Sequence, residues 1–196
     1  STLTRLLQRL HVPQRGRVLV DNMDISTVDP AWLRRSIGVV LQDSFIFNRS
    51  VRENIALADP SLPLNQVITA AKLAGAHEFV VDLAQGYETE LSEQGRNLSG
   101  GQRQRLGLAR VLYRDPKILV FDEATSSLDI ESEKKITDEI MKFSGKRTMI
   151  IVSHRINTIK DCDIIYYLKN GQIVDSGNYS QLMKVSKDFR TLVNDS

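Results

Sequence analysis

Residues 97–129 read NLSGGQRQRLGLARVLYRDPKILVFDEATSSLD, and they contain the strongest indications of the fold. Ser99 and the glycines after it precede a helical pattern, which Pro116 stops. The next run, KILVFDE, is nearly all apolar, as expected of a strand buried in a parallel sheet. That strand ends in two carboxylates, Asp122 and Glu123, at the sheet edge where open α/β folds place their ligands.

The segments on either side predict the rest of the sheet. Upstream, the apolar run 37–41 ends at Gln42. Downstream, IESEKKITDEIMKFS has the spacing of an amphipathic helix, and RTMIIVSH follows as a second buried strand. Strand, helix, strand is a βαβ crossover, so we expect an α/β fold with a mostly parallel sheet and flanking helices. Parallel strands end at one edge, which brings Gln42 and His154 toward the carboxylates.

The remaining segments are predicted to be helical or hairpin-like. A helical spacing of leucines opens the chain, and residues 60–95 form an inserted helical subdomain. Near the C-terminus, CDIIYYLKNGQIVDSG is a hairpin with its turn at Asn170 and Gly171. A terminal helix follows from about Tyr179.

Composition limits the class of protein. The chain has 196 residues, 41% apolar and 26% charged, typical of a soluble globular domain. Its net charge of +2 provides no overall field that would attract nucleic acid or an anionic membrane. The single cysteine, Cys162, cannot form an internal disulfide and favours a reducing, cytoplasmic setting. No apolar window reaches the roughly 20 residues of a membrane span, so we expect this chain to be soluble, although it could be cut from a membrane protein.

The polar strand ends suggest phosphoryl-transfer chemistry. Asp122 can hold Mg²⁺ through water, and Glu123 can orient or deprotonate an attacking water. Gln42 is a candidate ligand to the metal or the water, and His154 can meet the same phosphate. The alternatives at these positions are an acidic turn that caps a helix, a solvated glutamine and a structural histidine.

The LSGGQ string and the arginines after it each allow two interpretations. Glycines followed by a helix can offer backbone N–H groups to an anion, whereas Ser99 could simply cap the helix in a flexible loop. Arg103, Arg105 and Arg110 could form a nucleic-acid stripe, but no aromatic residues interleave them. We therefore expect a solvated helix face and no nucleic-acid partner.

In order and over essentially its whole length, the chain resembles the nucleotide-binding domain of an ATP-binding cassette transporter, a P-loop NTPase-like fold. The matching motifs are Gln42 (Q-loop), Leu98, Ser99, Gly100, Gly101 and Gln102 (signature), 118–122 (Walker B), Glu123 (catalytic carboxylate), 126–129 (D-loop) and His154 (switch histidine).

The resemblance implies ATP and Mg²⁺ as cofactors. Ser1 and Thr2 match the end of the P-loop, whose glycines and lysine would precede Ser1, so we expect the first strand and the P-loop to be missing from this chain and its own ATP binding to be impaired. Ser1, Gln42 and Asp122 are the implied Mg²⁺ ligands, and Thr2 and Asp129 join the signature in the implied nucleotide site.

The resemblance also implies a type of transporter. The stretches DPAWLRRSIGVVLQDSFIFNRSVRENIAL and AAKLAGAHEFV look most like bacterial type I (toxin) secretion ATPases, with peptide and bacteriocin exporters as close neighbours. TELSEQG (89–95) resembles the segment that contacts the transmembrane partner, although Ser92 replaces the usual glycine. In the parent protein, two such domains would pair head to tail, as a homodimer, and drive a transmembrane domain from the cytoplasmic face of the bacterial inner membrane.

On this interpretation, residues 1–43 and 115–196 form the catalytic core, and about 44–114 form the helical and signature subdomain. Two other functions remain open. A chromosome-maintenance or DNA-repair ATPase shares these motifs, but only 57 positions separate Gln42 from Ser99, with no heptad run for a coiled coil. A non-catalytic interaction module is the second, although Glu123 and His154 are kept as catalysis requires.

Overall fold

The computed structural model describes residues 2–42, 44–57, 59, 61, 63–125 and 130–194, without the side chains of 130–132. The chain divides into two units, Ser1–Val152 and Ser153–Ser196, and each is described by itself. In the part of the chain that is described, no helix is long and apolar enough to cross a membrane.

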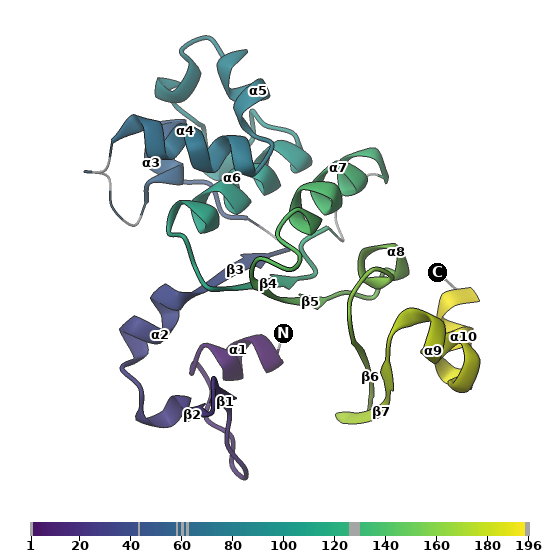
Figure 1. The fold of residues 1–196 in the computed structure, drawn as a ribbon. Helices are drawn as coiled ribbons and strands as arrows, with labels where there is room; N and C mark the ends of the chain where they lie inside the picture. The colour runs from purple at the N-terminus through teal and green to yellow at the C-terminus, as the bar shows by residue number, and fades with distance from the viewer. Residues whose placement is uncertain are drawn as a thin grey trace. The chain divides into compact units, whose positions relative to one another are not determined.

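A parallel sheet lies at the centre of the first unit (Figure 1). Its strands are β3 (Ile37–Leu41), β4 (Ile118–Asp122) and β5 (Thr148–Val152), in the order β3-β4-β5. The register aligns Leu41 with Asp122 and Asp122 with Val152, so all three strands end at the same edge. This arrangement confirms the expected α/β fold with parallel strands.

The two faces of β4 contact different cores, as the alternation of side chains along a strand requires. Leu119 and Phe121 belong to the large core under the helices, and Val120 belongs to a smaller core with Leu33 and Ile37 on the other face. Both faces of β4 are therefore covered, which explains why its sequence is a continuous apolar run.

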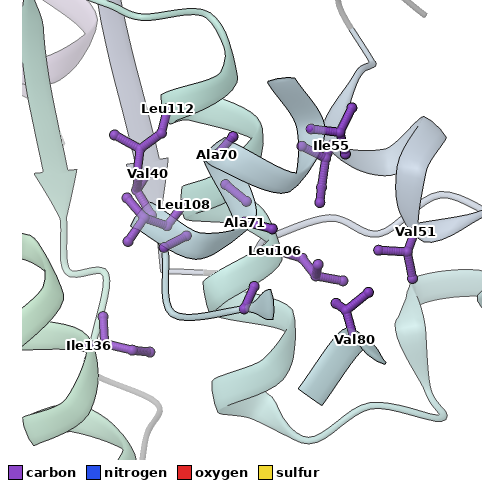
Figure 2. Packing of buried hydrophobic residues seen from close by; sticks show 14 of the residues in the cluster. Val40, Val51, Ile55, Ala70, Ala71, Val80, Leu106, Leu108, Leu112 and Ile136 are labelled. Carbon is purple, nitrogen blue, oxygen red and sulfur yellow. The ribbon is translucent and has the colours of Figure 1, made fainter. Parts of the chain in front are cut away.

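Helices cover the large core. Figure 1 shows α3 (Val51–Ile55), α4 (Leu64–Leu73) and α5 (His77–Val81) gathered around α6 (Gly100–Tyr113). Figure 2 shows side chains from these helices and from β3 meeting in one apolar cluster. The helix α7 (Ile130–Met141) joins the same core through Ile136 and Ile140.

The shorter elements of the first unit connect these parts. They are α1 (Thr2–Leu7), β1 (Leu19–Val20), β2 (Met23–Asp24), η1 (Ile25–Thr27), α2 (Pro30–Ser36), η2 (Gly86–Glu88) and η3 (Glu93–Gly95). The helices predicted at the start of the chain and across residues 60–95 are confirmed.

Gly38 lets β3 approach the helix layer closely. A Cβ atom at this position would lie 2.3 Å from Cγ1 of Val111 and 2.7 Å from Cγ of Pro116, both far inside contact distance. The absence of a side chain therefore fixes how closely α6 and the turn after it can pack on the sheet.

The expectation that 148–152 is a buried strand is wrong. Thr148 is exposed, Ile150 is 38% exposed, and the other residues of β5 are only partly buried. Among the described strands, β5 pairs with β4 alone. A neighbouring strand therefore covers one edge of β5, whereas both edges of β4 are covered.

The second unit contains α8 (Ile156–Ile159), β6 (Ile165–Lys169), β7 (Gln172–Gly177), α9 (Tyr179–Val185) and α10 (Lys187–Asn194). The strands β6 and β7 form the predicted hairpin, and Asn170 and Gly171 both have positive φ in its two-residue turn. Leu182 and Phe189 are buried in a small core of this unit, and the partly buried Cys162 packs against it.

Candidate active site at the strand ends and the signature helix

The strand ends bring two of the predicted residues to one edge. Gln42 follows Leu41 directly and is exposed, and Glu123 follows Asp122, which is 6% exposed. Because Leu41 and Asp122 are register partners, Gln42 and Glu123 leave the sheet from neighbouring strands. The two strands therefore end side by side, and the meeting of the Gln42 and Glu123 side chains remains a prediction.

Glu123 has an unusual backbone. Its φ is +51°, in the left-handed region, and its N–H donates to the carbonyl of Val152 at 2.8 Å. A residue other than glycine in this region carries strain of roughly 1–3 kcal/mol, which persists only where the surroundings impose it. The hydrogen bond to β5 continues the ladder one residue beyond β4 and holds Glu123 in this turn.

His154 belongs to the second unit, two residues after the end of β5. It is exposed, and the backbone around it is held by a hydrogen bond from the Arg155 N–H to Oγ of Ser153 at 2.9 Å. The meeting of His154 with the phosphate that Glu123 and Asp122 would serve remains a prediction.

Ser99 caps α6 through a reciprocal pair of hydrogen bonds. The Gln102 N–H donates to Ser99 Oγ at 3.2 Å, and the Ser99 N–H donates to Gln102 Oε1 at 2.8 Å. Such a capping box fixes the start of the helix and so the direction of its first N–H groups. Gly100 and Gly101 form the first turn.

Leu98 of the signature segment packs in the protein interior. Its side chain is 5% exposed and lies in the large core, and its carbonyl accepts a hydrogen bond from Arg103 at 2.6 Å. Leu98 therefore anchors the signature segment to the core.

The segment after Gln42 lies along the segment before the signature. The Leu91 N–H donates to the carbonyl of Arg49 at 3.0 Å, the Val51 N–H donates to that of Thr89 at 3.1 Å, and the Gln94 N–H donates to that of Ile46 at 3.2 Å. The stretch TELSEQG, expected from the resemblance to face a transmembrane partner, is thus hydrogen-bonded to the chain that leaves the Gln42 strand.

The expectation of a solvated arginine face on α6 is wrong. Arg103 donates hydrogen bonds to backbone carbonyls. The Arg105 guanidinium lies 5.3 Å from the ring centre of Phe79. Arg110 donates three hydrogen bonds to oxygen atoms of Phe45 and Asn54. Planar guanidinium groups can satisfy carbonyls and stack on rings while partly buried, so an arginine pattern alone does not indicate solvation.

Two buried polar residues that the sequence interpretation missed join this region. Asn54 is 0% exposed and Gln104 is 3% exposed. A signal for Asn54 was present, because it lies three residues after Val51 and beside Ile55 on the apolar face of a short helix. The sequence gives no such signal for Gln104, because glutamine in a helix rich in Gln and Arg is expected to be exposed to solvent.

The oxygen donors suit magnesium. Asp122 supplies a carboxylate and Gln42 an amide oxygen at adjacent strand ends, and Mg²⁺ is usually held by one or two carboxylates together with water and substrate phosphates. Among the described residues, no group of three or more His, Cys, Asp or Glu side chains could hold a metal. Ser1 and Asp129 lie outside the described residues, and Thr2 is an exposed residue at the start of α1.

A family model described as "ABC transporter" matches residues 1–126. The chain belongs to the ABC transporter family. The expected family is thereby confirmed, and membership implies nucleotide binding by the domain.

Relatives of this ABC domain are close in sequence. The leukotoxin translocation ATP-binding proteins LktB of Mannheimia haemolytica and of Bibersteinia trehalosi are each 54% identical over 186 residues, which is 95% of this chain and 26% of the relative. The chain thus spans about a quarter of the length of these curated relatives.

A solved structure agrees with the fold. A bacterial Atm1-family ABC exporter with ATP bound superposes with a TM-score of 0.92 at 38% identity, over 99% of this chain and 34% of the exporter chain. The curated relatives are leukotoxin translocation proteins and the solved structure is an ABC exporter, so neither a DNA-repair ATPase nor a non-catalytic module is favoured.

Proposed function

We propose that the chain is part of the ATP-hydrolysing motor of a membrane exporter of the type I, toxin-secreting class. The observation that carries this proposal is the shared strand edge, where Gln42 and Glu123 follow register partners beside the buried carboxylate of Asp122. The 54% identity to leukotoxin translocation proteins supports the class of exporter.

In this mechanism Glu123 accepts the proton of the attacking water. A carboxylate is a suitable general base when it is held by its backbone, as Glu123 is by its hydrogen bond to Val152. Asp122 and Gln42, together with Ser1, would hold Mg²⁺, which supplies charge neutralisation on the phosphates. His154 would meet the γ-phosphate, and Thr2 and Asp129 would contribute to the nucleotide site.

The signature acts on the nucleotide of a second copy. The helix α6 begins at Gly100 directly after the Ser99 cap, and the start of a helix is a favourable place for a phosphate anion. We propose a head-to-tail homodimer in which each signature closes over the other domain's ATP, with residues 1–43 and 115–196 as core and about 44–114 as the helical subdomain. A transmembrane domain on the cytoplasmic face of the bacterial inner membrane would receive the motion.

The test compares ATP binding and hydrolysis by the 196-residue chain with those of a protein extended upstream of Ser1. We expect Mg²⁺-dependent hydrolysis in the extended protein and little in the shorter chain, because the P-loop lysine and glycines proposed upstream would provide most phosphate contacts. A folded extended protein without hydrolysis would exclude the motor function and favour an interaction module.

A further inference from the structure

One face of α6 holds the segment that follows Gln42. Gln104, which is 3% exposed, donates from Nε2 to the carbonyl of Leu41 at 3.0 Å and accepts a hydrogen bond from Oγ of Ser44 at 3.3 Å. The same side chain therefore binds the last residue of β3 and a residue of the following loop.

Gly107, one turn further along α6, lets that loop come close. A Cβ atom at residue 107 would lie 2.1 Å from Oγ and 2.7 Å from Cβ of Ser44, but 3.9 Å from its Cα. The side chain of Ser44 thus occupies the space that any residue larger than glycine would need.

Arg110 is the third contact on this face. Its guanidinium donates from Nη1 to the carbonyl of Phe45 at 2.8 Å, from Nε to the carbonyl of Asn54 at 2.8 Å and from Nη2 to Oδ1 of Asn54 at 3.1 Å. The group also lies 5.5 Å from the ring centre of Phe47. Removal from water lowers the pKa of Arg110, as expected of a cation held by dipoles and a ring instead of by solvent.

Asn54 completes the arrangement from the other side of the loop. Its Oδ1 accepts from the Phe47 N–H at 2.9 Å, and its Nδ2 lies within 3.2 Å of the carbonyls of Phe47, Arg49 and Ser50. The loop between β3 and α3 is therefore held by its own buried amide, and that amide is held by Arg110.

We propose that Arg110 and Asn54 are positioning residues, which tie the loop after Gln42 to the signature helix so that Gln42 and Ser99 keep a fixed mutual geometry. The catalytic consequence rests on the proposed function. Arg110 and Asn54 act through Gln42 and the signature, so their loss should slow hydrolysis of bound ATP without weakening its binding.

The first test replaces Arg110 in the full-length protein that carries this chain. Arg110→Lys keeps the charge but cannot form the three-donor fork. The control is Tyr113→Phe, which removes a hydrogen bond from the same helix to the carbonyl of Asp59, 2.8 Å away, in a different loop.

The readout is the hydrolysis rate per nucleotide-binding site, with sites counted by titration. This normalisation removes the effect of any unfolded fraction. We expect Arg110→Lys to lower kcat per site between about tenfold and about a hundredfold with KM for ATP unchanged, since small misplacement of a positioned group has effects of this size. Tyr113→Phe should behave as the unsubstituted protein. An unchanged kcat per site in Arg110→Lys, or a change in KM alone, overturns the proposal.

A second pair of variants applies if Arg110→Lys does not fold. Gly107→Ala should displace the loop through its clash with Ser44 and lower kcat per site. Adding Ser44→Gly removes both clashing atoms and should restore most of the rate. Failure of the second substitution to restore any activity contradicts positioning of the loop by this face.

Hydrogen exchange separates this proposal from the proposed function. In the full-length protein, the amides of residues 44–50 should exchange faster in Arg110→Lys than in Tyr113→Phe. If the unsubstituted protein hydrolyses no ATP, the proposed function fails, and exchange alone decides whether the loop is tied to α6. Unchanged exchange in Arg110→Lys overturns the tie itself.

Discussion

Leu41 of β3 is the register partner of Asp122 of β4. Because of this pairing, Gln42 and Glu123 are the first residues after the ends of two adjacent strands. A shift of one residue in this register would turn the side chains of one strand to the other face of the sheet. The packing of Leu119 and Phe121 against the large core therefore fixes the position of the candidate catalytic carboxylate as well.

Glu123→Gln in the full-length protein tests the general base. Glutamine has the shape of glutamate but cannot accept the proton of the attacking water, so we expect turnover to fall by about a hundredfold to ten-thousandfold. ATP binding should persist and trap the paired domains, visible as a nucleotide-dependent dimer in size-exclusion chromatography. Undiminished turnover would remove Glu123 from this role.

Glu123→Gly tests the strain at the same position. The left-handed backbone favours glycine by about 1–2 kcal/mol, and the greater freedom of glycine in the unfolded chain offsets about 0.5–1 kcal/mol of that gain. We therefore expect Glu123→Gly to unfold at the same or higher urea concentration than Glu123→Ala, which keeps a Cβ atom. A glycine variant clearly less stable than the alanine variant would show that the backbone is not strained.

Asn54→Ala tests the buried amide. The substitution leaves the Phe47 N–H and one Arg110 donor without their buried acceptor, so we expect the free energy of unfolding to fall by about 2–4 kcal/mol. Thr69→Ala is the control, because it removes an exposed hydrogen bond to the carbonyl of Asn65 and should change stability by less than about 0.5 kcal/mol. Equal effects in urea unfolding would contradict the central role of Asn54.

Tyr87 predicts a dependence of stability on alkaline pH. Burial, followed by the charge of Glu78, raises the pKa of Tyr87 from 10.0 to about 12, and its hydroxyl lies 2.9 Å from Nδ1 of His77. Between these pH values the unfolded chain loses this proton and the folded chain keeps it, so the unfolded state is favoured as pH rises. Stability should therefore decline from about pH 10 to pH 12, and Tyr87→Phe should flatten this decline in urea unfolding. An equal decline in both proteins would assign the dependence to other groups.

The strand ends were predictable because each is marked by a change from apolar to polar residues. The strand β3 ends with the apolar run before Gln42, and β4 ends at Asp122, one residue after its apolar run. The start of α6 was predictable in the same way, since a serine followed by a glutamine three residues later is a local capping pattern.

The contacts of Arg110 were not predictable from sequence. Its acceptors lie 56 and 65 positions away, and nothing in the local pattern of α6 distinguishes this arginine from one that faces water. The exposure of Ile150 was missed for a related reason. An apolar strand reads the same whether one flank or two are covered, because pairing partners are a property of the whole sheet.

The acceptors around Arg110 have a further consequence. Among the described residues they are three backbone or amide oxygens and an aromatic ring, with no carboxylate that acid could neutralise. Dissolved salt weakens the electrostatic attraction between exposed charged groups far more than it weakens the interaction of a half-buried cation with dipoles. The contacts of Arg110 that hold this loop on the signature helix should therefore be equally strong at high and at low salt concentration, and at pH 5 and pH 8.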